Sequence, residues 1–346
     1  MKNCVLAQPN EVNDFISEFE KLVPEGSQLY GEELLSGVGA DRLISEIFSA
    51  ALQKTGGIVE FFLILLGVGL LFAVCDISGE LFGERLHSAA RAGVAAVSAL
   101  LIFSKLESLV FSVGESLASL SDFFSALIPL VTGISLASGA VGTAAVEAFN
   151  MNLALSVIGK ISSDFLMPTV FMIFALALTT SIGDGGAAKL AKGAKSVFLW
   201  GLGIISFVLI VSVSMQTFLA SSRDSAAMRA AKYALSGSIP IVGSTVSGAL
   251  STLMGALSEA SAVVGVGAVA VIFTMAAAPV AVMLLYRLAL SVSIWLFEFI
   301  GSLGAVGSFS AFRAALDALI SIYAVSAVIY ILEITVFIKG GTRVFV

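Results

Sequence analysis

Long apolar runs, most of them close to the length of a membrane span, dominate the pattern of this chain. A helix needs about 20 predominantly apolar residues to cross a bilayer, and in hydrocarbon its backbone groups must be bonded internally. The runs lack the strict alternation of β-barrel strands. The pattern therefore predicts an all-α, polytopic integral membrane protein with about 7–9 hydrophobic helices. The runs lie at about 58–75, 90–111, 123–145, 149–159, 165–182, 197–220, 236–258, 261–285, 288–304 and 316–338.

The first 57 residues follow a different pattern, with apolar positions at helical spacing between charged side chains. Amphipathic helices are predicted over 11–23, with Asn10 as its N-cap and Pro24 as its stop, and over 41–53. Nine acidic and four basic side chains make this region acidic. We interpret it either as a helical cap packed on the rest of the chain or as a segment that docks a partner at the water interface. The predicted domains are an acidic N-terminal region, 1–57, and a helical membrane domain, 58–346.

Matching prolines divide the membrane domain into two similar halves, at about 86–182 and 197–293. An offset of 111 residues relates both proline pairs, and an Ile-Pro sequence in each half precedes a Gly/Ser/Thr-rich run. We interpret this as an internal repeat. The prolines within one half are 39 residues apart, roughly 58 Å of helix, which predicts a helical hairpin broken at its prolines. Whether the repeats are inverted or parallel stays open. The pairs are Pro129 with Pro240 and Pro168 with Pro279.

Broken, glycine-rich segments at corresponding places in two halves are typical of two different functions. Secondary transporters build their binding sites from such segments. Small residues also let membrane helices pack closely, without any transported solute. The sequence leaves both interpretations open.

Arg287 is the most informative charged residue, because it stands inside the apolar run MLLYRLALSVSIWLFEF. An arginine inside a membrane must face a partner or water. Glu298 follows eleven residues later, close to three helical turns, so both side chains are expected on one face. Arg287 is interpreted as a gate or pathway residue, as half of a structural pair with another helix, or as a side chain snorkelling at the end of a span. Further acids near or within spans are Glu147, Asp164, Glu259, Asp317 and Glu333.

Composition supports the membrane assignment, with 58% hydrophobic and 12% charged residues against about a quarter charged in soluble proteins. Two basic segments, 183–196 and 221–235, are predicted as loops on either side of the run 197–220. Basic loops favour the cytoplasmic side. Because these two flank a single span, charge does not define the topology.

Catalytic and cofactor-binding patterns are missing from the sequence. The single histidine, His87, excludes the zinc motif HExxH, and two cysteines build no disulfide framework. SIGDGG at 181–186 and ALSGS at 234–238 each lack a glycine of the intramembrane protease motifs that they approach. The net charge of −6 does not suit nucleic acid. We therefore expect no enzyme activity, catalytic residue, metal or cofactor, and no nucleic-acid partner.

The stretch KYALSGSIPIVGSTVSGAL at 232–250 resembles the signature region of the stage III sporulation protein AE family. The layout is similar from about Asp41 onwards, including AAAPVAVMLLYRLAL at 276–290. Family members usually begin with a cleaved signal segment, and this chain starts without an apolar signal core. The resemblance therefore implies either a shortened start or insertion directed by the first span.

The resemblance implies a role in endospore formation, as a membrane component of the channel complex that joins mother cell and forespore and sustains late forespore gene expression. The implied location is the mother-cell (outer forespore) membrane. Implied partners are the lipid bilayer, a secretion-type ATPase and ring-forming proteins of the same complex, and a homo-oligomer is compatible with them. No catalytic residues are carried over from the family. The alternative is a self-sufficient secondary transporter or permease that uses the proline-marked repeats.

Overall fold

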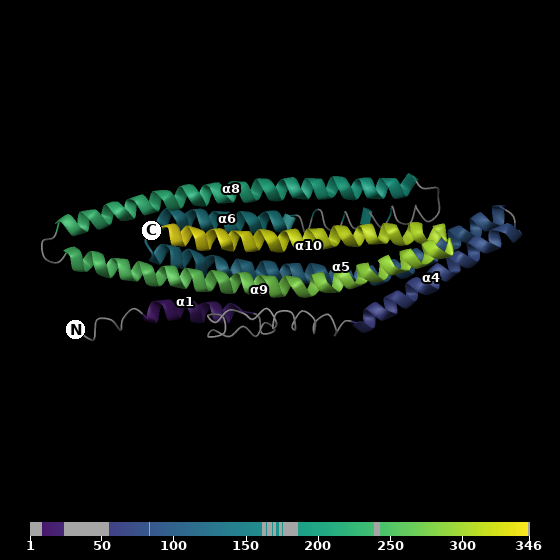
Figure 1. Ribbon diagram of the computed structural model, residues 1–346, viewed down its shortest axis with the longest axis horizontal. Coiled ribbons are helices and arrows are strands. Elements are labelled where there is room, and N and C mark those ends of the chain that lie inside the picture. The colour runs from purple at the N-terminus through teal and green to yellow at the C-terminus, as the bar shows by residue number, and fades with distance from the viewer. Residues whose placement is uncertain are drawn as a thin grey trace.

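Helices packed side by side make an elongated bundle (Figure 1). The computed structural model describes residues 9–23, 55–82, 84–160, 186–238 and 243–344, and single positions between 161 and 175. These residues contain seven helices and no strand, and six of the helices are long and apolar enough to cross a membrane. The all-α, membrane-spanning prediction is thus confirmed. The helices are α1 (Pro9–Leu22), α4 (Thr55–Phe82), α5 (Glu84–Ala137), α6 (Val141–Lys160), α8 (Gly186–Ser238), α9 (Gly243–Ile300) and α10 (Leu303–Val344).

Several predicted spans join into single long helices. α5 includes the run 90–111 and the first part of the next run, and α9 includes most of three runs. With 54, 53 and 58 residues, α5, α8 and α9 are each roughly 80 Å long or more, over twice the ~30 Å of a bilayer's hydrocarbon core. The two predicted basic loops were also wrong, because α8 runs from Gly186 through both segments. Their Ala, Lys, Arg and Met residues favour helix, and nothing in them terminates it.

Pro129 and Pro279 do not break their helices, so the prediction of hairpins broken at the prolines is wrong at these two positions. Pro129 lies inside α5 and Pro279 inside α9. A proline removes the hydrogen bond to the carbonyl four residues earlier, and in membranes a neighbouring helix can replace it. For Pro279 that carbonyl belongs to Met275, and the Tyr323 hydroxyl of α10 donates to it at 3.4 Å.

The internal repeat stays a prediction. Pro240 lies outside the described residues, and Pro168 is exposed in a helical position whose neighbours are not described. α5 continues eight residues beyond Pro129, whereas α8 ends two residues before Pro240. Contacts across the bundle make α6 antiparallel to both α5 and α8. The leading helices of the two predicted halves thus run in the same direction, as parallel repeats would require.

The N-terminal helix α1 confirms the first amphipathic prediction. It begins at Pro9, one residue before the predicted cap Asn10, because proline suits the first turn of a helix. Phe19 is buried in the common core, and α1 lies against α5 and α9. For α1, this contact favours the interpretation of the N-terminal region as a helical cap packed on the rest of the chain. The second predicted amphipathic helix, 41–53, lies outside the described residues.

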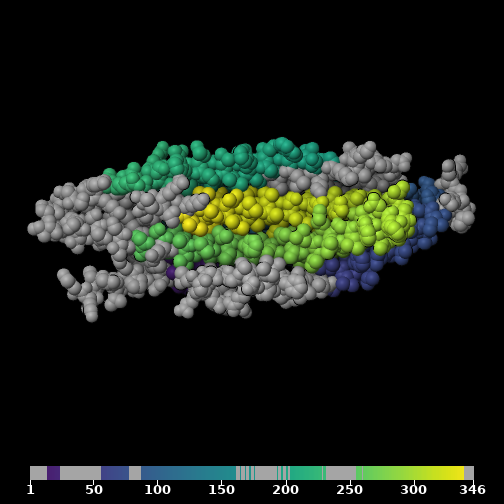
Figure 2. All heavy atoms as spheres, in the orientation of Figure 1, coloured from purple at the N-terminus to yellow at the C-terminus, as the bar shows by residue number. Residues whose placement is uncertain are grey.

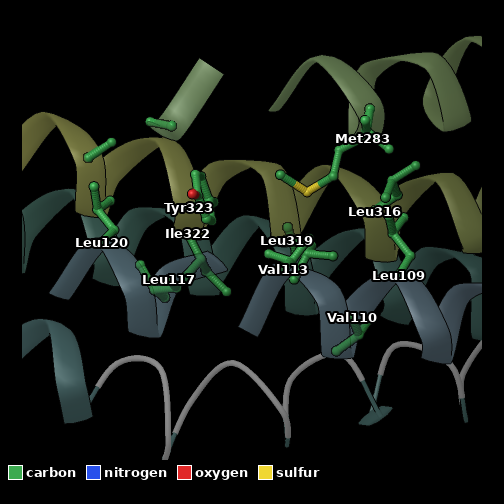
Figure 3. Close-up of a cluster of buried hydrophobic side chains, with 14 of the residues drawn as sticks. Leu109, Val110, Val113, Leu117, Leu120, Met283, Leu316, Leu319, Ile322 and Tyr323 are labelled. Atoms are coloured by element: carbon green, nitrogen blue, oxygen red, sulfur yellow. The ribbon is translucent and has the colours of Figure 1, made fainter. Parts of the chain in front are cut away.

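The core follows α10, which contacts α4, α5, α6, α8 and α9. In the space-filling view α10 lies between α8 and α9 (Figure 2). Figure 3 shows Met283 of α9 directed at a layer of leucine, isoleucine and valine side chains from α5 and α10. Tyr330 of α10 stacks on Phe124 of α5, with ring centroids 4.2 Å apart, and shares a 2.9 Å hydrogen bond with Ser121.

Helix α4 packs against α9 at a glycine. Gly69 faces the ring of Phe297, and a Cβ added there would lie 2.6 Å from Cδ2 and closer still to two other ring atoms. About two turns earlier on α4, Phe61 meets Tyr286 with ring centroids 5.0 Å apart. The Lys105 ammonium also donates to Glu60 at 2.7 Å, which ties α4 to α5.

Candidate functional site

Arg287 forms an ion pair with Asp317 of α10, with 2.5 Å between Nε and Oδ1. The arginine side chain is 44% exposed and the aspartate 18%. Of the alternatives for Arg287, the structural pair with another helix is thus the one that the structure describes. Arg287 faces the outside of the bundle, and Glu298 is also exposed. A role in gating or in a pathway stays a prediction.

The residues singled out from the sequence do not form one site in the described part of the chain. Pro279, Arg287 and Glu298 follow one another along α9, whereas Pro129 is exposed on α5. The structure instead gathers polar side chains at the turn between α5 and α6, all of them buried except the half-buried Asp224, and we call this group the corner cluster. The corner cluster consists of Ser135, Ser138, Thr143, Glu147, Asn150, Thr217, Ser221 and Asp224.

The turn that creates the corner cluster is a glycine-dependent helix end. Backbone bonds run from Ser138 N to the Ile134 carbonyl and from Ala140 N to the Ser135 carbonyl at 3.0 Å. Gly139 has φ 79°, the left-handed conformation that commonly ends a helix. α6 consequently folds back along α5, and Ser135 donates to Glu147 Oε2 at 2.6 Å.

Matching polar positions line α6 and α8 where the two helices meet. On α6 the residues are Thr143, Glu147 and Asn150, and on α8 they are Thr217, Ser221 and Asp224, with identical spacings that place each set on one helical face. The helices are antiparallel, so the two sets pair in reverse order. The hydrogen bonds between them are 2.6 Å from Thr143 N to Asp224 Oδ2 and 3.3 Å from Asn150 Nδ2 to Thr217 Oγ1.

Asp224 caps the N-terminus of α6 from the neighbouring helix. The residue before α6 is Ala140, which has no oxygen to accept a first-turn N–H, and Asp224 supplies a carboxylate instead. Negative charge is favourable at this end of a helix. Gly142 makes the approach feasible, because a Cβ there would lie 2.8 Å from Asp224 Oδ1.

Three buried oxygen atoms without a hydrogen-bond partner lie together in the corner cluster. They are Thr143 Oγ1, Glu147 Oε1 and Asn150 Oδ1, in side chains that are 0%, 3% and 1% exposed. Buried polar groups normally find partners, so unpaired ones point to function or to an unseen ligand. An ionisable side chain inside a span is itself a functional candidate. This cluster, rich in acceptors, is therefore the candidate site of the chain.

Sequence reasoning identified only part of this site. Glu147 was noted as one acid among several, and Asp224 was not singled out. The repeated spacing in Thr143-x3-Glu147-x2-Asn150 and Thr217-x3-Ser221-x2-Asp224 was the available signal. In the described ranges, no three His, Cys, Asp or Glu side chains gather as a metal site would require.

Comparison with known proteins gives one family. Residues 36–341 match the family described as stage III sporulation protein AE. The chain is 23% identical over 297 residues to the Bacillus subtilis (strain 168) protein named stage III sporulation protein AE, covering 81% of this chain and 72% of that protein. No solved structure matches. The match extends over most of the membrane helices, and the chain belongs to the stage III sporulation protein AE family.

Proposed function

We propose that this chain is a multi-pass membrane component of the channel complex between mother cell and forespore, required for endospore formation and for late forespore gene expression. Family membership over residues 36–341, together with six helices able to cross a membrane, is the observation that carries the proposal. Its proposed location is the outer forespore membrane. The chain would act as a membrane core or scaffold, while partner proteins supply any catalysis.

The bundle's construction supports a scaffold role. Side-chain bonds tie its helices together, among them the Lys105–Glu60 bond between α5 and α4 and the Thr143–Asp224 bond between α6 and α8. Long continuous helices extend beyond the thickness of one hydrocarbon core. Such helices offer surface to proteins outside the bilayer, which suits docking of a secretion-type ATPase and of ring-forming proteins.

Deletion of the gene, combined with a reporter of late forespore transcription, tests the proposal. Reporter activity should be lost in the deletion strain and restored by the wild-type gene. Affinity purification from sporulating cells should recover the ATPase and ring proteins with this chain. Normal late reporter activity in the deletion strain would remove the proposed role.

A self-sufficient secondary transporter is the second candidate, and the corner cluster is the observation that favours it. Buried oxygen acceptors between membrane helices are the kind of group that binds coupling ions. Purified chain in liposomes distinguishes the two functions. Solute uptake without partner proteins would support the transporter, whereas uptake that depends on the partners would support the channel component.

A further inference from the structure

The corner cluster has more hydrogen-bond acceptors than donors that reach them. The Ser138 and Ser221 hydroxyls donate to the carbonyls of Ser135 and Phe218, at 2.7 and 3.1 Å. The Ser135 hydroxyl serves one oxygen of Glu147. The second oxygen of Glu147 remains unpaired, as do Thr143 Oγ1 and Asn150 Oδ1, whose residues lie one turn earlier and one turn later on the same face of α6.

The charge of this cluster is also unbalanced. The charged neighbour that acts on Glu147 is Asp224, a second acid. Asp224 is compensated by the N-terminal end of α6, where it accepts a hydrogen bond from the Thr143 amide. Glu147 faces the C-terminal end of α5 through Ser135, and the C-terminal end of a helix attracts positive charge. A buried, uncompensated carboxylate costs several kcal/mol, so this site favours a small cation.

We propose that Glu147 binds a single sodium ion, with Thr143 and Asn150 supplying further oxygen atoms. Carboxylate, hydroxyl and amide oxygens are hard ligands, which select hard cations over zinc or copper. A monovalent ion balances the one carboxylate that is available, because Asp224 is already committed to α6. The sodium site does not depend on the proposed channel role, since it is a property of the chain alone.

Thermal unfolding of the purified full chain in detergent tests the sodium site. Sodium chloride replaces choline chloride at constant ionic strength and constant pH, so that screening does not change. The unfolding midpoint of the wild type should rise with sodium and then saturate, because a ligand that binds only the folded state stabilises it. Potassium should have a much smaller effect.

Variants connect the effect to the site. Glu147→Gln should abolish the sodium-dependent shift, and Asn150→Ala should weaken the apparent sodium affinity by at least about tenfold. Thr143→Val serves as the substitute variant if Glu147→Gln does not fold. Glu115→Gln is the control, because Glu115 is an exposed acid on α5, and it should keep the wild-type response.

Each other outcome overturns the proposal. An equal shift with potassium would reject sodium as the ligand. A midpoint that depends on pH and ignores sodium would identify the ligand as a proton. A sodium effect that persists in both Glu147→Gln and Asn150→Ala would place the ion elsewhere, and no sodium effect on the wild type would remove the site.

Discussion

Replacing Gly69 with alanine tests how closely α4 packs against α9. The new Cβ would lie 2.6 Å from Cδ2 of Phe297, whereas carbon atoms pack best at about 3.5–4.0 Å. Phe297 is completely buried, and its ring meets Phe309 at a centroid distance of 6.0 Å. The ring must therefore move within a filled core, or α4 must move away from α9.

Two opposing contributions decide how much Gly69→Ala changes the free energy of unfolding. Overpacking a filled core costs about 1–3 kcal/mol, while alanine in place of glycine favours the helix by about 1 kcal/mol. Gly67→Ala is a matched control two residues earlier, because nothing lies within 4 Å of a Cβ at Gly67. Only the favourable term acts there. The free energies of unfolding of the two variants should thus differ by about 1–3 kcal/mol, and Gly69→Ala should be the less stable variant.

Thermal unfolding of both variants in one detergent measures this difference. At about 2–4 °C per kcal/mol, the midpoint of Gly69→Ala should fall several degrees below that of Gly67→Ala. Adding Phe297→Leu to Gly69→Ala should recover part of the loss, since the smaller side chain makes room. Equal midpoints for the two alanine variants would refute the close packing. So would a double variant that is destabilised by more than Gly69→Ala and Phe297→Leu together.

Three further predictions concern contacts between helices. Exchanging the charges, with Arg287→Asp and Asp317→Arg together, should restore forespore reporter activity that either change alone reduces; no recovery would argue against a direct pair. Tyr323→Phe should lower the free energy of unfolding by about 1 kcal/mol. The loss should be smaller in a Pro279→Ala background, where the backbone hydrogen bond to the Met275 carbonyl is restored. Equal losses in both backgrounds would show that the Tyr323 hydroxyl does not bond to that carbonyl. Gly142→Ala should displace the carboxylate that caps α6 and cost about 0.5–2 kcal/mol, partly offset by helix propensity; a midpoint above the wild type would exclude this cap.

The apolar pattern predicted the existence of the membrane helices but not their ends. Hydropathy falls wherever a helix is expected to meet water, as it does at Arg223 and Lys232, and these residues continue α8 without interruption. The ends are set instead by backbone geometry. Gly139 and Gly301 both have positive φ, and each lies where one long helix gives way to the next.

The continuity of α9 through Pro279 and most of the corner cluster could not be predicted for a related reason, because each depends on a contact across the bundle. Pro279 leaves a carbonyl that needs a donor, and the donor Tyr323 is 44 positions further along the chain, on another helix. Asp224 caps a helix whose first turn lies about eighty residues earlier. A pair with another helix was one of three alternatives for Arg287, and Asp317 was one of several acids near spans, so only the structure identifies the two as partners.

The central position of α10 has a consequence for the order of assembly. α10 follows, in the chain, every other membrane helix that it contacts. Half of its most apolar stretch is buried, against 28% for α8. While the ribosome makes the chain, α4, α5, α6, α8 and α9 therefore enter the membrane around a space that is not yet filled. Ser121 and Phe124 can meet Tyr330 only after α10 has been made. The bundle therefore closes after translation of its last core helix, and until then the side chains that α10 covers have no protein partner in its place.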